Sequence, residues 1–207
     1  MKHLVLLLVV LCCFNDLWSQ EVFTSKKISI RNDDAYFLVG RINGSTLLFR
    51  DRVDSYRLHA FDDEMNELFD KKIELQTKRG RILDVIPGAN DFTVIYRYFK
   101  KGKVNVYAQK ISIQGDTLAG ATVVSFNPRA TNFMKVTRSQ DKSKLMLFDT
   151  DLGKRLYLTV FDLNNLNVVW DRSFTPPDFS YERDFLDAEV DNKGNAYVIL
   201  EKDNRKS

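Results

Sequence analysis

The run LYLTVFDLNNLNVVWDRSF, from Leu156 to Phe174, decides the fold that we expect for this chain. Strands are predicted over Leu156–Phe161 and Asn167–Phe174, because both segments are rich in β-branched and aromatic residues. Between them, residues 162–165 (Asp-Leu-Asn-Asn) supply turn chemistry, since Asp and Asn side chains bond their own backbone and tolerate left-handed dihedral angles. Apolar side chains occupy both faces of the first strand, so we expect it to be covered on both sides.

Degraded copies of this run lie upstream at a constant spacing. Phe61, Ile111 and Phe161 stand about 50 residues apart, and each is followed by Asp or Ser, a turn and an apolar pair. These pairs are Leu68-Phe69, Leu118-Ala119 and Val168-Val169. The second strands of the units overlay at Leu47-Leu48-Phe49, Val94-Ile95-Tyr96, Met146-Leu147-Phe148 and Val198-Ile199-Leu200. The opening strands overlay at Ile82-Leu83-Asp84-Val85, Phe133-Met134-Lys135-Val136 and Phe185-Leu186-Asp187-Ala188.

The repeat predicts the fold class. Four short antiparallel strands per unit, repeating at about 50 residues, are typical of a β-propeller blade. We therefore expect an all-β chain, a β-propeller built of four-stranded antiparallel blades. A β-sandwich and an up-and-down barrel are the alternatives, but those folds need alternation without a long-period repeat. Blades pack face to face around an axis, which also explains why the opening run is apolar on both faces.

The predicted strands divide the chain into units. Complete blades are expected at residues 35–80, 81–131 and 132–182, with a partial blade at 183–207. The partial blade has two predicted strands, Phe185–Val190 and Ala196–Glu201. We therefore expect an open or truncated propeller, and favour the N-terminal portion of a longer one. Residues 20–34 are expected to hold a strand, Val22–Ile30, that closes the ring by pairing with the last blade.

One family resemblance follows from these residues. Leu156–Asp162 followed by Val168-Val169-Trp170 resembles the repeat of WD40-like and quinoprotein-like propellers, in which a strand ending in Asp precedes a turn and a strand with Trp. The resemblance runs from Ala35 to the C-terminus and implies an architecture, not an activity. Trp stands at this place only in the third unit, and no cofactor-binding set is seen, so the resemblance implies no quinone cofactor. Trp170 is expected to pack between blades.

The N-terminus has the parts of a secretory signal peptide. A basic start precedes an uncharged apolar run, Leu4–Cys13, and a small residue, Ser19, stands at the expected cleavage point. We therefore predict a signal peptide at residues 1–19 and an exported protein that is periplasmic, cell-surface or secreted. The run is shorter than the roughly 20 apolar residues of a membrane span, so no span is expected after cleavage. An uncleaved anchor is the alternative.

Composition narrows the possible partners. The 31 basic and 28 acidic residues are interspersed and leave a net charge of +3, so no nucleic-acid partner is expected. The two cysteines, Cys12 and Cys13, lie in the predicted signal peptide, which leaves the mature chain without thiols. The ligand is expected to be a protein or a carbohydrate, which the sequence does not identify.

Most catalytic and metal chemistries lack their residues here. His59 is the one histidine of the mature chain, and we expect a cross-strand surface residue rather than a general base or a member of a Ser-His-Asp triad. Without cysteine, and with one histidine, no zinc, copper or haem site of the usual kind is expected, and no cofactor is predicted. Residues 149–153 resemble the start of a calcium loop, but Val160 replaces the Glu at its twelfth position, so a hairpin turn is expected.

Three charged residues are the binding candidates. Asp84, Lys135 and Asp187 occupy matching places in the opening strands, which would line the central channel of a propeller. We expect an exported binding or interaction scaffold without catalysis of its own. The alternative is part of a propeller enzyme, a carbohydrate-active hydrolase or lyase, whose catalytic residues lie mainly outside this chain. A carboxylate pair for glycoside hydrolysis could involve Asp84, Asp187 and Glu189.

Overall fold

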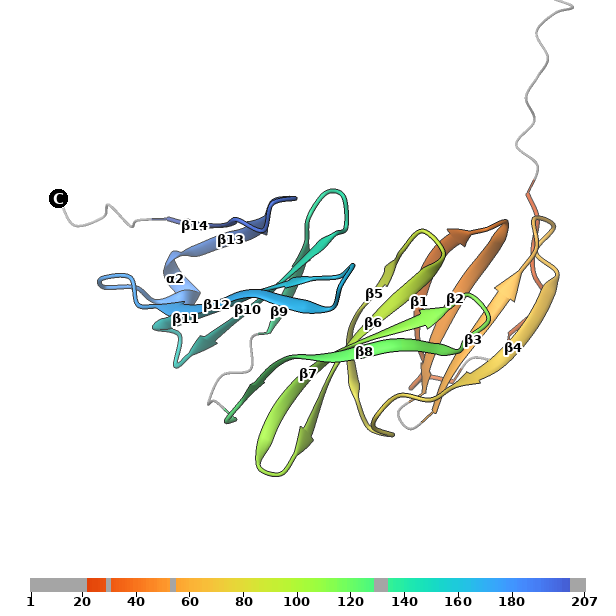
Figure 1. The fold of residues 1–207 in the computed structure, drawn as a ribbon, viewed down its shortest axis with the longest axis horizontal. Helices are drawn as coiled ribbons and strands as arrows, with labels where there is room; N and C mark the ends of the chain where they lie inside the picture. Colours follow the sequence, from red (N-terminus) through yellow and green to blue (C-terminus); the bar gives the residue numbers. More distant parts are fainter. Residues whose placement is uncertain (1–21, 29–30, 53–54, 129–133, 202–207) are drawn as a thin grey trace, which may run out of the picture.

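The structure is a computed structural model that describes residues 22–28, 31–52, 55–128 and 134–201 (Figure 1). Within these ranges the chain forms three four-stranded antiparallel sheets, one two-stranded sheet and one short helix. Each four-stranded sheet follows the order of the sequence, so consecutive strands within a sheet are paired and its first and last strands are the edges. The predicted signal peptide at residues 1–19 lies outside the described residues.

The three four-stranded sheets come from consecutive stretches of sequence. The first contains β1 (Ala35–Ile42), β2 (Ser45–Arg52), β3 (Ser55–Phe61) and β4 (Glu67–Ile73). The second contains β5 (Arg81–Pro87), β6 (Asp91–Lys100), β7 (Lys103–Ser112) and β8 (Thr117–Phe126). The third contains β9 (Lys135–Arg138), β10 (Lys144–Asp151), β11 (Arg155–Asp162) and β12 (Asn167–Phe174). We number these sheets blades 1 to 3.

The last sheet has two strands, β13 (Phe185–Val190) and β14 (Ala196–Leu200), and we call it the partial blade. The single turn of helix α2 (Tyr181–Asp184) precedes it and was not expected from the sequence. Four residues are too few to show the apolar periodicity by which a helix is recognised. The turn is held locally, since the Asp184 carboxylate accepts a hydrogen bond from the Ser180 amide at 2.8 Å.

Tight turns with residues in the left-handed region connect the strands of the hairpins. Asn43 and Gly44 join β1 to β2 with φ angles of 49° and 80°, so both residues of the pair occupy the left-handed region that a type I′ turn requires. Leu152 and Gly153, with φ angles of 48° and 68°, turn the chain between β10 and β11. The segment that resembles a calcium loop is therefore a hairpin turn, as expected.

A bulge repeats at one place in all three complete blades and confirms the long-period repeat. Near the end of the third strand, the fourth strand carries one extra residue, which lies between the partners of residues 60 and 61, of 110 and 111, and of 160 and 161 respectively. The third-strand residues at this point are Phe61, Ile111 and Phe161. The extra residues are Leu68, Leu118 and Val169, and all three are exposed.

The sequence overlay of the second strands is wrong by one residue in blade 2. Phe61, Ile111 and Phe161 pair with Thr46, Phe92 and Leu145 respectively. Val94 therefore matches Leu48 and Leu147, not Leu47 and Met146. A shift of one residue moves a side chain to the other face of its sheet, and a run that is apolar on both faces gives no pattern that would reveal the shift.

Three apolar clusters fill the spaces between consecutive sheets. The first joins Leu47, Phe49, Leu58 and Ala60 to Phe92, Val94, Tyr96 and Ile111. The second joins Ile95, Val106 and Ala108 to Leu145, Leu147 and Phe161. The third joins Met146, Phe148, Leu158 and Val160 to Ala188 and Val190. The middle strands of blades 2 and 3 are thus covered on both faces, as their sequences predict.

Trp170 has the expected position between sheets. It packs against the third cluster, and its indole Nε1 donates a hydrogen bond to the Gly194 carbonyl oxygen at 2.8 Å. Residue 170 lies on β12 and residue 194 between β13 and β14, so the bond ties blade 3 to the partial blade.

Figure 1 shows the sheets side by side in an open row, with blade 1 and the partial blade at opposite ends. Repeated four-stranded antiparallel sheets that pack face to face are β-propeller blades, and here they do not close into a ring. Residues 22–28 form no strand, so the predicted closing strand Val22–Ile30 is absent from its described part, and residues 29–30 lie outside the description. Within the described residues, no helix has the length and apolar character needed to cross a membrane.

Candidate functional site

The first strands of the sheets form a continuous surface, which we call the inner-strand surface. β1 packs beside β5, and β9 packs beside β13. An ion pair joins β5 to β9, between Asp84 Oδ2 and Arg138 Nε at 3.4 Å. The three binding candidates from the sequence belong to this surface, since Asp84 lies on β5, Lys135 on β9 and Asp187 on β13.

The three candidates occupy one register position. Asp84, Lys135 and Asp187 pair with Ile95, Phe148 and Ile199 on the second strands of their sheets. Ile95 and Phe148 are equivalent, because each lies three residues after the second-strand residue, Phe92 or Leu145, that pairs with the equivalent third-strand positions Ile111 and Phe161. The two aspartates also share their local structure, because each follows a bulge and accepts a hydrogen bond from the next amide at 2.8 Å.

The candidates do not converge into one cluster, because each faces a neighbouring strand. The Asp84 side chain is 22% exposed and is paired with Arg138 of β9. Lys135 places its Nζ 5.0 Å from the centre of the Phe185 ring on β13, within cation–π range. Asp187 is exposed and makes no ion pair with the described residues.

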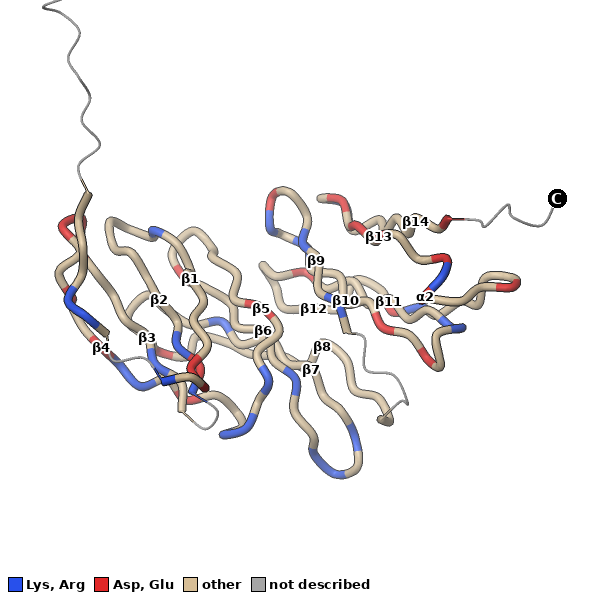
Figure 2. Tube along the Cα trace, turned by 180° about the vertical axis from the view of Figure 1, so that it is seen from behind, with Lys and Arg blue, Asp and Glu red and all other residues tan. Residues whose placement is uncertain are grey.

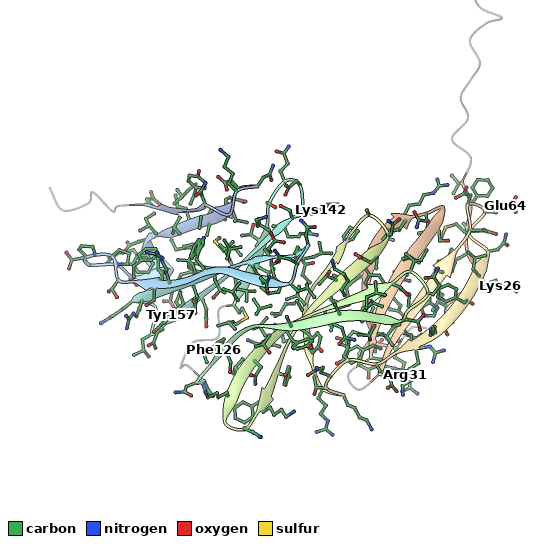
Figure 3. All side chains as sticks on the ribbon, in the orientation of Figure 1. Lys26, Arg31, Glu64, Phe126, Lys142 and Tyr157 are labelled. Atoms are coloured by element: carbon green, nitrogen blue, oxygen red, sulfur yellow. The ribbon has the colours of Figure 1, made fainter. Side chains whose placement is uncertain are left out.

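Two open hollows border the inner-strand surface and share Val39, Pro87 and Lys142. One measures about 470 Å³, and its lining includes Tyr36, Phe37, Asp84 and Arg138. The other measures about 540 Å³, and its lining includes Arg41, Gly88, Asp141 and Asn164. The tip of the β9–β10 connection, marked by Lys142 in Figure 3, reaches both hollows. Lys135 and Asp187 line neither.

Arg138 and Lys142 were not identified from the sequence. Arg138 lies on the same strand as Lys135, but its contact with Asp84 depends on how blade 3 is rotated against blade 2. Lys142 lies in a turn that looks like any solvated loop and has a φ of 59°. Both are lysine or arginine residues near the ends of an opening strand, and that is the only signal the sequence contains for them.

The acids of the hollows are bound to other groups and are not arranged for acid–base catalysis. Among the described lining residues, the carboxyl groups are those of Asp84 and Asp141. The Ser139 hydroxyl, followed by the Ser143 amide, lowers the pKa of Asp141 below its usual value. Asp84 is separated by β9 from Asp187 and Glu189 on β13, so these three carboxylates are not assembled around one point.

A smaller hollow of about 270 Å³ lies between blades 2 and 3, on the far side of the second cluster. Phe126 and Tyr157, labelled in Figure 3, belong to its lining on opposite sides. The hollow also contains the buried Asp149 and the Asp171 carboxylate, which accepts a hydrogen bond from Thr159 Oγ1 at 3.1 Å. No sequence pattern indicates this hollow, because its residues come from four strands of two blades.

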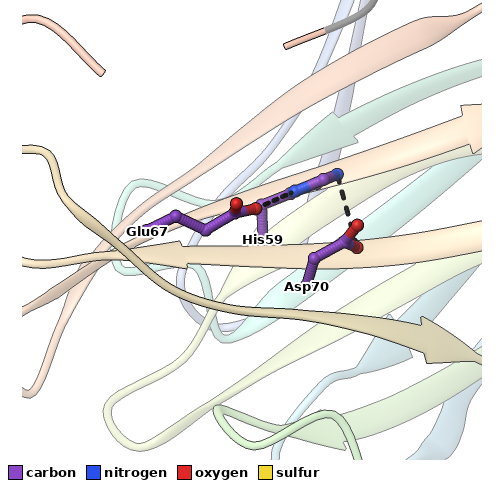
Figure 4. A group of neighbouring side chains, drawn as sticks. All are labelled: His59, Glu67 and Asp70. Carbon is purple, nitrogen blue, oxygen red and sulfur yellow. Dashed lines mark hydrogen bonds and ion pairs between the residues drawn. The ribbon is translucent and has the colours of Figure 1, made fainter. Parts of the chain in front are cut away.

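His59 is buried, which corrects the expectation of a surface residue. Its side chain is 3% exposed, and its ring is stacked on that of Phe61 with centroids 6.4 Å apart. Nδ1 lies 2.9 Å from Glu67 Oε1, and Nε2 lies 3.6 Å from Asp70 Oδ1 (Figure 4). Ligand atoms of the three residues lie within 4.8 Å of one another, an arrangement that could hold a metal ion. The cross-strand position was expected, since His59 on β3 pairs with Asp70 on β4.

Neither a protein-family model nor a curated protein matches the chain. Among solved structures, it is similar to prolyl oligopeptidase B from Galerina marginata, with a TM-score of 0.43, 10% identity, and coverage of 84% of this chain and 24% of that one. It is also similar to TolB from Acinetobacter baumannii, with a TM-score of 0.37, 17% identity, and coverage of 75% of this chain and 37% of that one. For the β-propeller domain of Nup133 from Vanderwaltozyma polyspora, the TM-score is 0.38 and the identity 10%, with coverage of 90% of this chain and 56% of that one. The chain therefore spans about a quarter of the length of prolyl oligopeptidase B (24%).

Proposed function

We propose that this chain is an exported β-propeller scaffold that binds a ligand on its inner-strand surface and has no catalysis of its own. The observation that supports the site is the row formed by Asp84, Lys135 and Asp187, which occupy one register position on three consecutive opening strands. Such a row repeats at the spacing of the blades and presents charges of both signs.

A segment of another protein suits this surface better than a nucleic acid or an isolated sugar. The hollows beside the row combine aromatic side chains, Tyr36 and Phe37, with the charges of Arg138 and Lys142. Peptides offer apolar side chains and charges of both signs, and complementary charges steer association and fix register. Basic and acidic segments are interspersed along the described part of the chain (Figure 2), so a polyanion would meet charges of both signs.

Each of the two hollows beside the inner-strand surface has one carboxyl group in its described lining, Asp84 in one and Asp141 in the other, and this favours a scaffold over an enzyme at this surface. Glycoside hydrolases need two carboxyl groups at a fixed separation across one substrate bond. Asp84 is paired with Arg138 instead, and Glu189 accepts a hydrogen bond from Thr137 Oγ1 at 3.4 Å.

The test is a binding screen in which every bound ligand is also checked for turnover. The chain is expressed in a secreting host, and export predicts a mature protein that begins at Gln20. It is then screened against displayed peptides and arrayed glycans. We expect a peptide ligand that is recovered intact by mass spectrometry and whose affinity falls about tenfold or more in Asp84→Asn and Lys135→Ala.

The matched control is Asp116→Asn, which breaks an exposed ion pair with Lys71 (2.7 Å) away from the inner-strand surface. Its affinity for the ligand should equal that of the wild type. If the affinity for the ligand is unchanged in both Asp84→Asn and Lys135→Ala, the binding site lies elsewhere. Cleavage of a bound glycan or peptide would favour the enzyme, and retention of residues 1–19 would contradict export by a cleaved signal.

A further inference from the structure

The imidazole of His59 is held in one orientation. It lies on the third strand of blade 1 with 3% of its side chain exposed, between the cross-strand neighbours Leu48 and Asp70. The ring stacks on Phe61 at an interplanar angle of 15°. The two ring nitrogens therefore face fixed partners, Glu67 on one side and Asp70 on the other (Figure 4).

Glu67 determines which nitrogen of the neutral ring bears the proton. Its Oε1 lies 2.9 Å from Nδ1, and an ionised carboxylate can only accept a hydrogen bond. Nδ1 is therefore the donor, and the lone pair of the ring lies on Nε2. A carboxylate that fixes the tautomer in this way is a common outer partner of histidines that bind metals.

Nε2 is a buried acceptor without a hydrogen bond from the described residues. It lies 3.6 Å from Asp70 Oδ1, so that in the neutral ring with the proton on Nδ1 two electron-rich atoms face each other. Leaving a buried polar atom unsatisfied costs about 1–3 kcal/mol. A cation between the two would give Nε2 the partner that it lacks and would add a second partner to Asp70 Oδ1, which already accepts a hydrogen bond from Arg57 Nε.

The separation suits a metal ion. Zinc binds imidazole nitrogen and carboxylate oxygen at about 2.0–2.1 Å, and two such ligands 3.6 Å apart subtend an angle of about 120° at the ion. The carboxylates are reachable from solvent, because the Glu67 and Asp70 side chains are 40% and 33% exposed. Arg57 holds Asp70 in place through its Nε, 2.6 Å from Oδ1. With two carboxylates, one guanidinium and a neutral imidazole, the group has a net negative charge.

We propose that His59 Nε2 and the Asp70 carboxylate bind a Zn²⁺ ion, with Glu67 fixing the tautomer and water completing the coordination. The sequence argues against a zinc site of the usual kind, since it offers one histidine and no thiol in the mature chain. The strand pairing supplies what the sequence does not show, because β4 brings two carboxylates to the ring from opposite sides. An imidazole ligand favours zinc over Mg²⁺ and Ca²⁺, which prefer oxygen.

The experiment titrates Zn²⁺ into the full chain and follows the ring nitrogens of His59 by ¹⁵N NMR. The substitutions His3→Ala, Cys12→Ser and Cys13→Ser remove the other imidazole and both thiols, so that His59 gives the only histidine signal. We expect Zn²⁺ to shift the Nε2 resonance and leave Nδ1 protonated, while an equal concentration of Mg²⁺ leaves the Nε2 resonance unchanged. Zn²⁺ should also raise the midpoint of thermal unfolding.

Variants on the exposed side of the site avoid disturbing the buried ring. Asp70→Asn should weaken the Zn²⁺ affinity by at least about tenfold, and Glu67→Gln by about 10- to 100-fold. Asp116→Asn, in the exposed pair with Lys71, is the matched control and should bind as the parent chain does. The proposal is overturned if excess Zn²⁺ leaves Nε2 unmoved, if Nε2 responds to pH alone, or if Asp70→Asn binds Zn²⁺ as tightly as the parent.

Discussion

Single aspartates close the turns of this chain through a recurring set of bonds. The Asp62 carboxylate accepts from the Asn66 amide at 2.8 Å and from the Asn66 side chain at 3.1 Å. Asp191 accepts the same two bonds from Asn195, both at 2.8 Å. In each case the asparagine side chain is the largest influence, and it lowers the pKa of the aspartate below its usual value. The turns at Asp62 and Asp191 are thus stabilised by the same pair of local hydrogen bonds.

These bonds predict how stability changes with pH. A carboxyl group whose pKa is lower in the folded chain stabilises it above the unfolded pKa, and the stabilisation is lost as pH falls through the folded pKa. The free energy of unfolding, measured with urea, should therefore fall below about pH 4. The fall should be shallower in the double variant Asp62→Asn/Asp191→Asn, which lacks both titrating groups.

The control removes the same number of carboxylates from exposed ion pairs. Asp63 pairs with Arg41 and Asp116 with Lys71, at 2.6 and 2.7 Å. The variant Asp63→Asn/Asp116→Asn should keep a steeper pH dependence than Asp62→Asn/Asp191→Asn. Equal slopes for the two double variants would show that the turn bonds do not set the pH dependence.

The surroundings of a single residue can be predicted from the sequence where its contacts are local, and not where they depend on strand pairing or blade packing. Asp62 and Asp191 were recognisable as turn residues, because the physics of an Asx turn is local. His59 was not recognisable as buried, because its burial depends on the stacked ring of Phe61 and on the pairing of β3 with β4. The contact between Asp84 and Arg138 likewise depends on the packing of two blades.

At the level of elements, the partial blade contacts blade 3 through one face of its sheet and through neighbouring residues of β9. Ala188 and Val190 of β13 pack on the third cluster, and the Trp170 indole bonds to the Gly194 carbonyl. Tyr197 and Ile199 of β14 are more than half exposed, at 55% and 52%. The sheet is therefore anchored on one face, and opening of β13–β14 should require less free energy than unfolding of blades 1 to 3.

Removing one contact should loosen the partial blade locally. Trp170→Phe keeps most of the packing but deletes the indole donor, which is worth about 1 kcal/mol. We expect the amides of β13 and β14 to exchange about fivefold faster with deuterium, while amides of β6 and β7 are unchanged. Leu118→Ala, at the equivalent bulge residue of blade 2 with 55% exposure, is the control and should leave the exchange of β13 and β14 unaffected. Uniformly faster exchange in all sheets would contradict a local role.

Strand positions were the most predictable elements. The predicted bounds of β12 (Asn167–Phe174) and β13 (Phe185–Val190) match the structure, because residue types and turn residues mark them locally. The match between blades was less predictable, as the one-residue error at Val94 shows. Helix α2 escaped prediction because a single turn has no periodicity. Local patterns thus define strands, while register requires knowledge of pairing.

Across the whole molecule, each sheet is stabilised by its neighbours in the row. The three apolar clusters lie between consecutive sheets. Blade 2 belongs to two of them, with Val94 in the first and Ile95 in the second. Mutations between blades should therefore affect global stability far more than equal changes on outer edges. The sequence could predict this sandwiching from the two-sided apolar strands, although it does not determine how the row ends.

Two phenylalanines of one strand test this arrangement with the same substitution. Phe92 on β6 is 0% exposed in the cluster between blades 1 and 2, while Phe99, seven positions along the strand, is 67% exposed. Phe92→Ala should lower the free energy of unfolding by about 3–5 kcal/mol, because it removes buried area and leaves a cavity. Phe99→Ala should change it by less than about 0.5 kcal/mol. Urea unfolding of both variants measures the difference, and similar losses in the two would mean that the blades are not stabilised through the face-to-face clusters.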